Sequence, residues 1–462
     1  MTSSDSIHEI NLKYPVFAAH FLSDTRLIVA GGGGEGNNGI KNKISLLDIP
    51  SGSEPTAAGT STIDVLAEYE LPKSEDNPTS FAIDRAEGLV YAGVNRDMER
   101  VKQKDNDHLR IFELSEDATT SENIAFDLVQ TKSIFASGSI DEFQKITKFQ
   151  ATQNLLAISN SIEPGTIVVL STVEKDDLEL NINYTHIVKN GYINDFDVYD
   201  GNDYLVYATS ERLVLLELAT GVELSFVIEV EPGYRFNKIK FTGKNRLLAV
   251  LSPPRKKSPL LVEFELTGEK HQFTVVKKAT LSGVSAIVTG LDVSKRLAAL
   301  TTADFSLVIV DLASLRIVKR FRNLHPFAIT ALAFNESGSL LATGSAANLI
   351  KVIEIPESGN FNESGQTVLY TIASAVILVL VAIVYQYIFK NGYLNTIEQF
   401  RAASTAKSVD FSGDYVSSAN DAVGTLAGAP PATTFDQNIN PVEKSEDNEE
   451  DNEKVISASS LL

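Results

Sequence analysis

The chain of 462 residues contains neither cysteine nor tryptophan. Without cysteine it can form no disulfide bond, no thiolate nucleophile and no cysteine-bound zinc site. It also lacks a surplus of basic residues, because 40 Lys and Arg stand against 60 Asp and Glu, a formal net charge of −20 at pH 7. Nucleic-acid-binding proteins carry a basic face, so this balance argues against a nucleic-acid partner. The six histidines are scattered without metal-ligand spacing, which argues against a zinc site.

The N-terminus, "MTSSDSIHEINLKYPVF", lacks a basic segment followed by an apolar one, so it predicts no signal peptide. One long apolar run is present near the other end. Residues 367–389, "TVLYTIASAVILVLVAIVYQYIF", are 23 residues without a charge. A helix of that length spans roughly 34 Å, enough to cross a hydrocarbon core of about 30 Å, whereas buried core helices are shorter. The run therefore predicts a single transmembrane helix.

The flanking charges and the order of synthesis favour opposite orientations of this span. Lys390, Arg401 and Lys407 follow it and Lys351 precedes it. The positive-inside rule alone would weakly favour a cytosolic C-terminus. However, the whole region before the span is made, and has time to fold, before the first insertion signal emerges. We therefore expect the N-terminal region in the cytosol and the C-terminal tail in a lumen.

Four segments follow from these features: a folded region of residues 1–355, a linker of 356–366, the span of 367–389 and a tail of 390–462. The tail is rich in Ser, Ala, Asp and Glu and ends in an acidic run. Such a composition cannot bury a core, so the sequence predicts a disordered tail.

The region before the span repeats one pattern. "HPFAITALAFNESGSLLATGSAANLIKVIEI" (325–355) reads as an alternating strand, a polar turn, an apolar strand ending in small residues, another turn and a third strand. The preceding unit has the same order around "RLAALTT". The apolar-then-small strand recurs earlier as "RLIVAGG", "GLVYAGV", "NLLAISN", "YLVYATS" and "RLLAVLS". Seven such units predict an all-β fold, a seven-bladed β-propeller.

The last two units resemble WD repeats in a degenerate form. Val310 and Asp311 hold the place of the Trp-Asp pair, and Asp304 and His325 hold the places of the structural Asp and His of that family. We expect structural roles for both. The last unit is one strand short, and the alternating residues 6–14, "SIHEINLKY", can supply its outer strand so that the two ends of the propeller clasp.

Three polar stretches read as insertions or hairpin tips. Residues 95–108 and 115–124 lengthen the early units. The basic loop "PPRKKSP" (Pro253–Pro259) reads as a solvated hairpin tip, and contact with an anionic lipid or an acidic partner is the alternative.

The first unit carries a glycine-rich stretch, "GGGGEGNNGIKN" (31–42), in which Gly34, Gly36 and Gly39 match G-x-G-x-x-G. A Rossmann fingerprint needs a helix after the last glycine, but "KISLLDI" reads as a strand. A P-loop needs Gly-Lys followed by Ser or Thr, and a protein kinase needs His-Arg-Asp and Asp-Phe-Gly downstream; the chain has none of these. We therefore expect no nucleotide to be bound directly by this stretch.

What remains is a long loop between the second and third strands of the first blade. One interpretation is a flexible insertion, but four glycines carry a conformational-entropy cost that an idle loop has no reason to retain. Ile40 is an apolar residue at the tip of a polar loop, and such a residue can anchor in a partner's pocket. Bent glycine-rich backbone also directs carbonyl oxygens inward, and with Glu35 these could enclose a hard cation.

A G-G-G-G-x-x-x-x-G-[I/V]-x-N loop in the first blade, a degenerate seven-bladed propeller and one span near residue 370 resemble one family. It is the endoplasmic-reticulum membrane exchange factor for the Sar-type small GTPase, which starts COPII coat assembly. The chain length and acidic tail resemble fungal members. The resemblance implies a guanine-nucleotide exchange factor in vesicle-mediated ER–Golgi transport, a regulator that promotes GDP release without covalent chemistry, anchored in the membrane by one span.

The resemblance also implies roles for loop residues. In that family a bound potassium ion holds the loop, which inserts against the GTPase near its nucleotide site. Carried over, the GTPase contacts are Asn37, Asn38, Gly39, Ile40 and Asn42, with Ile40 as the apolar wedge. The potassium site is formed around Gly34, Glu35 and Gly36. The alternative is a membrane-tethered propeller scaffold that gathers partners without exchange activity.

Overall fold

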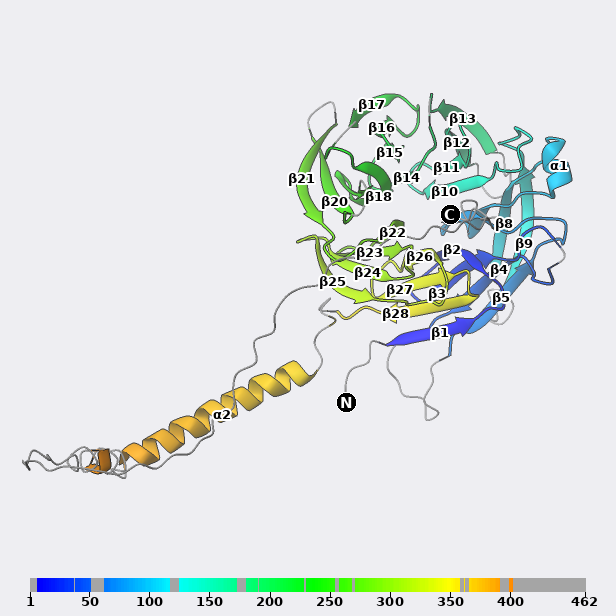
Figure 1. Ribbon diagram of the computed structural model, residues 1–462. Helices are drawn as coiled ribbons and strands as arrows, with labels where there is room; N and C mark the ends of the chain where they lie inside the picture. Colours follow the sequence, from blue (N-terminus) through cyan, green and yellow to red (C-terminus); the bar gives the residue numbers. More distant parts are fainter. Residues whose placement is uncertain are drawn as a thin grey trace, which may run out of the picture. The chain divides into compact units, whose positions relative to one another are not determined.

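The computed structural model describes residues 6–36, 38–50, 62–116, 124–172, 180–189, 191–227, 230–253, 257–267, 271–357, 361, 365–390 and 399–401. The chain divides into two units, Met1–Thr367 and Val368–Leu462. The first unit consists of seven four-stranded antiparallel sheets arranged as the blades of a propeller (Figure 1). The predicted all-β, seven-bladed propeller is confirmed.

The first three blades follow one another along the chain. Blade 1 is formed by β2 (Val16–Phe21), β3 (Arg26–Gly31), β4 (Lys43–Asp48) and β5 (Asp64–Glu70). Blade 2 is formed by β6 (Ser80–Asp84), β7 (Leu89–Gly93), β8 (Leu109–Glu116) and β9 (Ile124–Lys132), with helix α1 (Met98–Lys102) between β7 and β8. Blade 3 is formed by β10 (Gln144–Gln150), β11 (Leu155–Asn160), β12 (Thr166–Thr172) and β13 (Leu180–Ile187).

The next three blades continue the same order. Blade 4 is formed by β14 (Asp195–Val198), β15 (Tyr204–Ala208), β16 (Leu213–Glu217) and β17 (Glu223–Val227). Blade 5 is formed by β18 (Arg235–Gly243), β19 (Arg246–Ser252), β20 (Leu260–Thr267) and β21 (Gln272–Thr280). Blade 6 is formed by β22 (Val288–Val293), β23 (Leu297–Thr302), β24 (Leu307–Asp311) and β25 (Arg316–Phe321).

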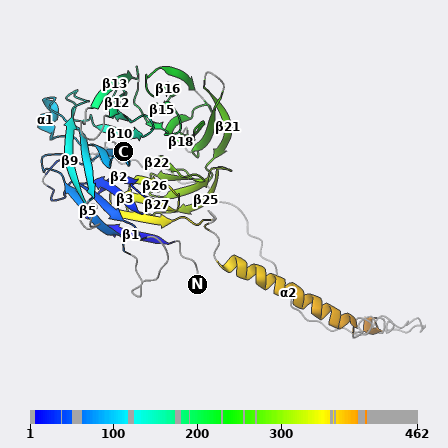
Figure 2. The ribbon, with the colours of Figure 1, turned by 180° about the vertical axis from the view of Figure 1, so that it is seen from behind.

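Blade 7 joins the two ends of the propeller. It contains β26 (Ile329–Phe334), β27 (Leu340–Ser345) and β28 (Leu349–Glu354), and β1 (Ile7–Asn11) pairs antiparallel with β28 as its outer strand. Ile7 lies opposite Ile353, and Asn11 lies opposite Leu349. The clasp expected from residues 6–14 is therefore confirmed, and Figure 2 shows β1 beside blade 7 from behind.

Each apolar-then-small segment found in the sequence is the second strand of a blade, because β3, β7, β11, β15, β19, β23 and β27 cover them. These strands are buried on both faces; all six residues of β11 and of β27 are buried. Adjacent blades pack face to face through them, so neither face needs polar residues. This explains why these segments read as continuous apolar runs, while the outer strands alternate.

His325 and Asp304 make polar contacts inside the propeller. His325 is buried and lies 2.8 Å from Oγ1 of Thr343 through Nε2, and burial lowers the pKa of its imidazole to about 4. Asp304 forms an ion pair with Arg320 at 3.3 Å. Both residues therefore make contacts within the propeller, in keeping with the expected structural roles.

Helix α2 (Gly365–Lys390) covers the predicted span 367–389. Its residues from Val368 onward belong to the second unit. In this helix the structure describes the side chains of residues 374–387 and of Lys390. Among the described residues, no helix is both long and apolar enough to cross a membrane. The helix is confirmed, and the membrane crossing stays a prediction.

Several predicted features lie outside the described residues. They are residues 391–398 and 402–462 of the tail, 358–360 and 362–364 of the linker, 117–123 of the second polar insertion, and 254–256 of the basic loop Pro253–Pro259. The first polar insertion, 95–108, is described and is an ordered segment that contains α1.

Candidate functional site

The glycine-rich loop, residues 32–42, connects β3 to β4 in blade 1. Connections in an antiparallel blade alternate between the two ends of its strands. The β3–β4 connection therefore lies on the same propeller face as the β5–β6 connection, which leads into blade 2, and the β7–β8 connection, which contains α1. We call this side the loop face. Three chain segments that are distant in sequence meet there.

The first glycines of the loop are required by close backbone contacts. A Cβ on Gly31 would lie 1.9 Å from the carbonyl oxygen of Pro15, and a Cβ on Gly32 would lie 2.0 Å from Oδ1 of Asn42. The amide of Gly32 also donates a hydrogen bond of 2.9 Å to Pro15. No other residue type fits these positions without displacing its neighbours, so the glycines have a packing role that a free insertion would not need.

Asn42 closes the loop at its base. Its side chain is buried, and its Oδ1 accepts a hydrogen bond of 3.0 Å from the amide of Gly34. Its Nδ2 donates to the carbonyl of Gly34 at 3.2 Å and to the carbonyl of Glu75 at 2.8 Å. One amide side chain thus joins the two limbs of the loop to each other and to the β5–β6 connection.

Asn38 forms a second, smaller closure near the turn. Its Nδ2 donates to the carbonyl of Gly33 at 2.7 Å, and its Oδ1 accepts from the amide of Ile40 at 2.9 Å. Asn38 and Gly39 are exposed at the turn. Gly39 has φ 80° and Gly36 has φ 137°, in the region that favours glycine, and a Cβ at either position would meet open space. Their backbone conformation, rather than crowding, explains the glycines there.

Ile40 differs from the expectation of an exposed tip. It is half-buried and packs against the core cluster that blades 1 and 7 share. An apolar side chain in a polar loop lowers its free energy by turning onto the nearest apolar surface, and the cluster beneath the loop provides one. The tip of the loop is therefore polar, and only part of Ile40 is available to a partner. Its contact role stays a prediction.

The other predicted residues are placed as follows. Gly34 and Glu35 are half-buried and Gly36 is exposed, all in the limb that leaves β3. Asn37 lies outside the described residues. Apart from Asn37, the predicted residues thus lie together in one loop, in which Asn38 and Asn42 shape the backbone.

The loop borders a hollow of about 440 Å³ on the loop face. It is lined by Gly34, Gly36, Gly39, Ile40, Lys41, Asn42, Leu71, Pro72 and Lys73. Lys41 forms an ion pair with Glu70 at the edge of the hollow, and its hydrogen bond lowers the pKa of that carboxyl. Both side chains are exposed, so the pair contributes little to stability. The hollow offers a partner both polar groups and the apolar surface of Ile40, Leu71 and Pro72.

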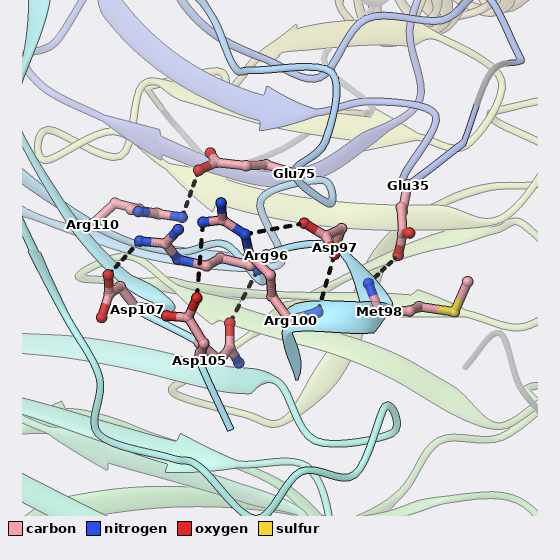
Figure 3. Close-up of polar contacts among 10 residues, drawn as sticks. Glu35, Glu75, Arg96, Asp97, Met98, Arg100, Asp105, Asp107 and Arg110 are labelled. Atoms are coloured by element: carbon pink, nitrogen blue, oxygen red, sulfur yellow. Dashed lines mark hydrogen bonds and ion pairs between the residues drawn. The ribbon is translucent and has the colours of Figure 1, made fainter. Parts of the chain in front are cut away.

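A polar network joins blade 2 to the β5–β6 connection, which in turn bonds the glycine loop (Figure 3). Nη2 of Arg110 lies 2.7 Å from Oε1 of Glu75, and both side chains are largely buried. Burial raises the pKa of the Glu75 carboxyl, and the Arg110 guanidinium opposes that rise. Asp76 continues the network, because its amide donates to the carbonyl of Asn95 at 2.9 Å and its Oδ1 accepts from the amide of Glu35 at 3.0 Å.

The oxygen atoms around Gly34 are of the type that potassium prefers as ligands. Asp76 supplies a carboxylate oxygen beside this residue, since a Cβ on Gly34 would lie 3.1 Å from its Oδ1, whereas the Glu35 carboxylate accepts a hydrogen bond of 2.7 Å from the amide of Met98. The glycine backbone adds carbonyl oxygens, the ligands that bind potassium in selective sites. Among the described residues, no group of three or more His, Cys, Asp and Glu could hold a metal. The loop therefore offers oxygen atoms of the right kind near Gly34, and potassium binding there stays a prediction.

The β5–β6 connection and α1 were not identified as parts of the site from the sequence. Glu75 and Asp76 follow the outer strand β5 in a polar, proline-containing stretch, and the α1 segment reads as a polar insertion. The one available signal was that both are connections that a propeller places on the same face as the glycine loop.

Comparisons with known proteins find relatives along most of the chain. The chain is 26% identical over 433 residues to the guanine nucleotide-exchange factor SEC12 of Candida glabrata, a match that covers 91% of this chain and 88% of that protein. It is 24% identical over 348 residues to the SED4 protein of the same organism, and 25% identical over 387 residues to that of Saccharomyces cerevisiae. Both SED4 proteins are named as candidate guanine nucleotide-exchange factors, and the matches span 32% and 34% of their lengths. No protein-family model matches the chain. The resemblance predicted from the sequence is confirmed.

Proposed function

We propose that this homologue of fungal guanine-nucleotide exchange factors is itself such a factor, acting on a Sar-type small GTPase at the endoplasmic-reticulum membrane to start COPII vesicle formation. Homology along most of the chain supports the general role. The observation that carries the proposal furthest is the glycine loop, which Asn42 and Asn38 close into a defined shape beside a hollow on the loop face.

The proposed mechanism is non-covalent. An exchange factor binds the nucleotide-free GTPase more tightly than the nucleotide-bound form, so by linkage it weakens nucleotide binding by the same factor. A loop can displace groups of its partner only if it is held in shape, since otherwise binding would order the loop instead. The hydrogen bonds of Asn42 provide that rigidity on the blade side of the loop.

Contacts with the GTPase are assigned to the polar turn. Asn38 and Gly39 are exposed at the turn, and the exposed part of Ile40 adds apolar surface. Asn37, which lies outside the described residues, is assigned as a contact from the resemblance alone. The hydrogen bonds of buried Asn42 support a shaping role for it in place of direct contact. Potassium, bound through Gly34, Glu35, Gly36 and neighbouring carbonyls, would supply positive charge that holds these oxygens together.

The uncharged residues 367–389 support a single membrane span at helix α2. The proposed orientation, with the propeller in the cytosol and the tail in the lumen, rests on the position of the span after the whole propeller region. Strand β28 leads toward this helix and ends on the face opposite the loop face. There Arg296 donates hydrogen bonds of 3.3 Å and 3.0 Å to the carbonyls of Pro356 and Glu357. Within the propeller, the loop face is therefore opposite the end at which β28 leaves blade 7.

The reciprocal affinity of the chain for two states of the GTPase tests this function. The full chain, purified in a mild detergent, is immobilised and titrated with nucleotide-free and GDP-loaded Sar-type GTPase. An exchange factor binds the nucleotide-free form much more tightly. Equal affinity for both forms would instead support the scaffold alternative, in which the propeller gathers partners without altering their nucleotide.

A further inference from the structure

Helix α1 of blade 2 lies beside the glycine loop and is connected to it. The amide nitrogen of Met98 donates a hydrogen bond of 2.7 Å to Oε2 of Glu35 (Figure 3). Glu35 belongs to blade 1 and Met98 to blade 2, so this bond crosses from one blade to the next. It is charge-assisted, because the acceptor is a carboxylate, and such bonds are stronger than neutral ones.

The segment that provides Met98 is itself well fixed. Asn95 and Asn106 are buried and joined by a hydrogen bond of 3.0 Å, and Asn95 donates to the carbonyl of Glu142 at 2.8 Å. The amide of Arg96 donates to the side chain of Asn106 at 3.0 Å, and Val101 is the buried residue of α1. The insertion is therefore a platform attached to the body of blade 2.

Other residues of α1 strengthen this platform. Asp97 accepts a hydrogen bond of 3.0 Å from the amide of Arg100, as an N-cap does. The Arg100 side chain lies 3.7 Å from Asp97 and 3.9 Å from Asp105. These bonds keep the first turn of α1, and with it the amide of Met98, at a defined position.

Glu35 is the point at which such a platform can control the loop. Its own amide is held by Asp76, and the next residue, Gly36, is exposed and has φ 137°. Beyond Glu35, the described residues of the loop on the β3 side have only glycine backbone before the turn. Anchoring the Glu35 carboxylate thus limits motion of the backbone that follows Gly34, which is the last residue of this limb that Asn42 bonds.

We propose that the second-blade insertion, residues 95–108, is the positioning element of the glycine loop, and that Glu35 is the positioning residue that transmits it. This inference rests on the proposed exchange function and extends it, since it makes activity depend on a helix that need not touch the GTPase. The Glu35 carboxylate thereby has a second role besides any contribution to a cation site.

Substitution of Met98 by proline tests the bond with little other disturbance. Met98 is the first helical residue after the cap Asp97, a position that tolerates proline. Asp97 has φ −57° and ψ 153°, the extended conformation that a residue before proline requires. Met98→Pro therefore removes the N–H donor and retains the helix. Met98→Ala is the matched variant, because it removes the same side chain and keeps the donor.

Two measurements are made on the full chain: nucleotide release from a Sar-type GTPase over a range of chain concentrations, and amide hydrogen exchange of residues 32–42. We expect Met98→Pro to lower the maximal release rate about 3- to 10-fold relative to Met98→Ala, the range for net loss of one ordinary hydrogen bond, because the bond to Glu35 is exposed to solvent. The loop amides should exchange faster in Met98→Pro. Glu35→Ala should act in the same way, and Glu35→Gln, which keeps an acceptor, should recover part of the loss.

The double variant Glu35→Ala/Met98→Pro should be no more impaired than Glu35→Ala alone, since Met98→Pro removes only an interaction that Glu35→Ala has already removed. Additive losses, or equal behaviour of Met98→Pro and Met98→Ala in both measurements, would overturn the inference. A chain that fails to accelerate release at all would refute the proposed function, and the hydrogen-exchange comparison would still decide whether α1 holds the loop.

Discussion

The side chain of Asn42 holds the backbone of Gly34 through both of its polar atoms: Oδ1 accepts from the amide at 3.0 Å, and Nδ2 donates to the carbonyl at 3.2 Å. The two residues are eight positions apart and lie on opposite limbs of the glycine loop. This pair makes the loop a closed structure with a fixed base, and the predictions below depend on it.

Asn42→Ala should open the loop. It leaves the amide of Gly34 and the carbonyl of Glu75 without their partner, and an unsatisfied buried group costs about 1–3 kcal/mol. We expect a lower midpoint of urea unfolding and a marked loss of nucleotide release. Asn335→Ala is the matched control, because Asn335 is a buried asparagine of the β26–β27 connection on the opposite face. It donates to the carbonyl of Asp24 in the β2–β3 connection and to Ser339. This variant should lose stability and keep the release activity; equal loss in both would contradict the shaping role of Asn42.

Ile40→Ala should reduce both stability and nucleotide release. The side chain packs on the cluster shared by blades 1 and 7, and because it is only half-buried the cost should be about 1–2 kcal/mol, below the range for fully buried isoleucine. Ile10→Ala is the control, since Ile10 is half-buried on the same cluster from β1. If the two variants lose release activity in proportion to their loss of stability, Ile40 has no contact role.

Replacement of potassium tests the proposed cation. With potassium chloride exchanged for N-methylglucamine chloride at equal ionic strength, screening is unchanged and only the ion that can enter the loop is removed. We expect a several-fold fall in release catalysed by the chain and faster hydrogen exchange at residues 32–42. Release from the GTPase alone, measured in both salts, is the control. Identical catalysed rates and identical exchange would argue against an ion in this loop.

Acidification should destabilise the propeller through His108. Burial lowers the pKa of its imidazole from 6.5 to about 4, and Nε2 accepts a hydrogen bond of 2.7 Å from the amide of Phe135, which protonation would break. The unfolded chain therefore binds a proton that the folded chain excludes. The stabilisation is full above pH 6.5 and is lost as the pH falls toward 4.

The size of this effect can be isolated by substitution. At pH 5 the shift of His108 corresponds to about 2 kcal/mol. Wild type and His108→Gln are compared by urea unfolding at pH 7.5 and pH 5. The variant should lose less stability between these two pH values than the wild type. Some loss should remain, because the imidazole pKa values of His20 and His325 are also lowered and these residues are present in both proteins. An equal loss in both proteins would show that His108 does not stay neutral in the fold.

The arrangement of the blades could be predicted from the sequence because the second strand of each blade is covered on both faces. Burial on both faces makes β27 and its counterparts continuous apolar runs, and these can be counted. The closing strand β1 was predictable for a related reason, since residues 7–11 alternate and the last unit had too few strands.

The details of the site were less accessible. Ile40 was expected at an exposed tip because its sequence neighbours are polar, but the apolar surface it covers is formed by residues from two blades. The bond between Glu35 and Met98 depends in the same way on how neighbouring blades meet. A pattern within one repeat carries no information about such contacts. The glycines of the loop, by contrast, are consecutive in the sequence and could be recognised from it directly.

The most direct measurement is the release of a fluorescent guanine nucleotide from a purified Sar-type GTPase, with and without the full chain, in potassium buffer. Wild-type chain should accelerate release in proportion to its concentration until the GTPase is saturated, and Asn42→Ala should lose most of that acceleration. A GTPase that binds the wild-type chain yet releases its nucleotide at the intrinsic rate would contradict the account and leave the propeller as a scaffold.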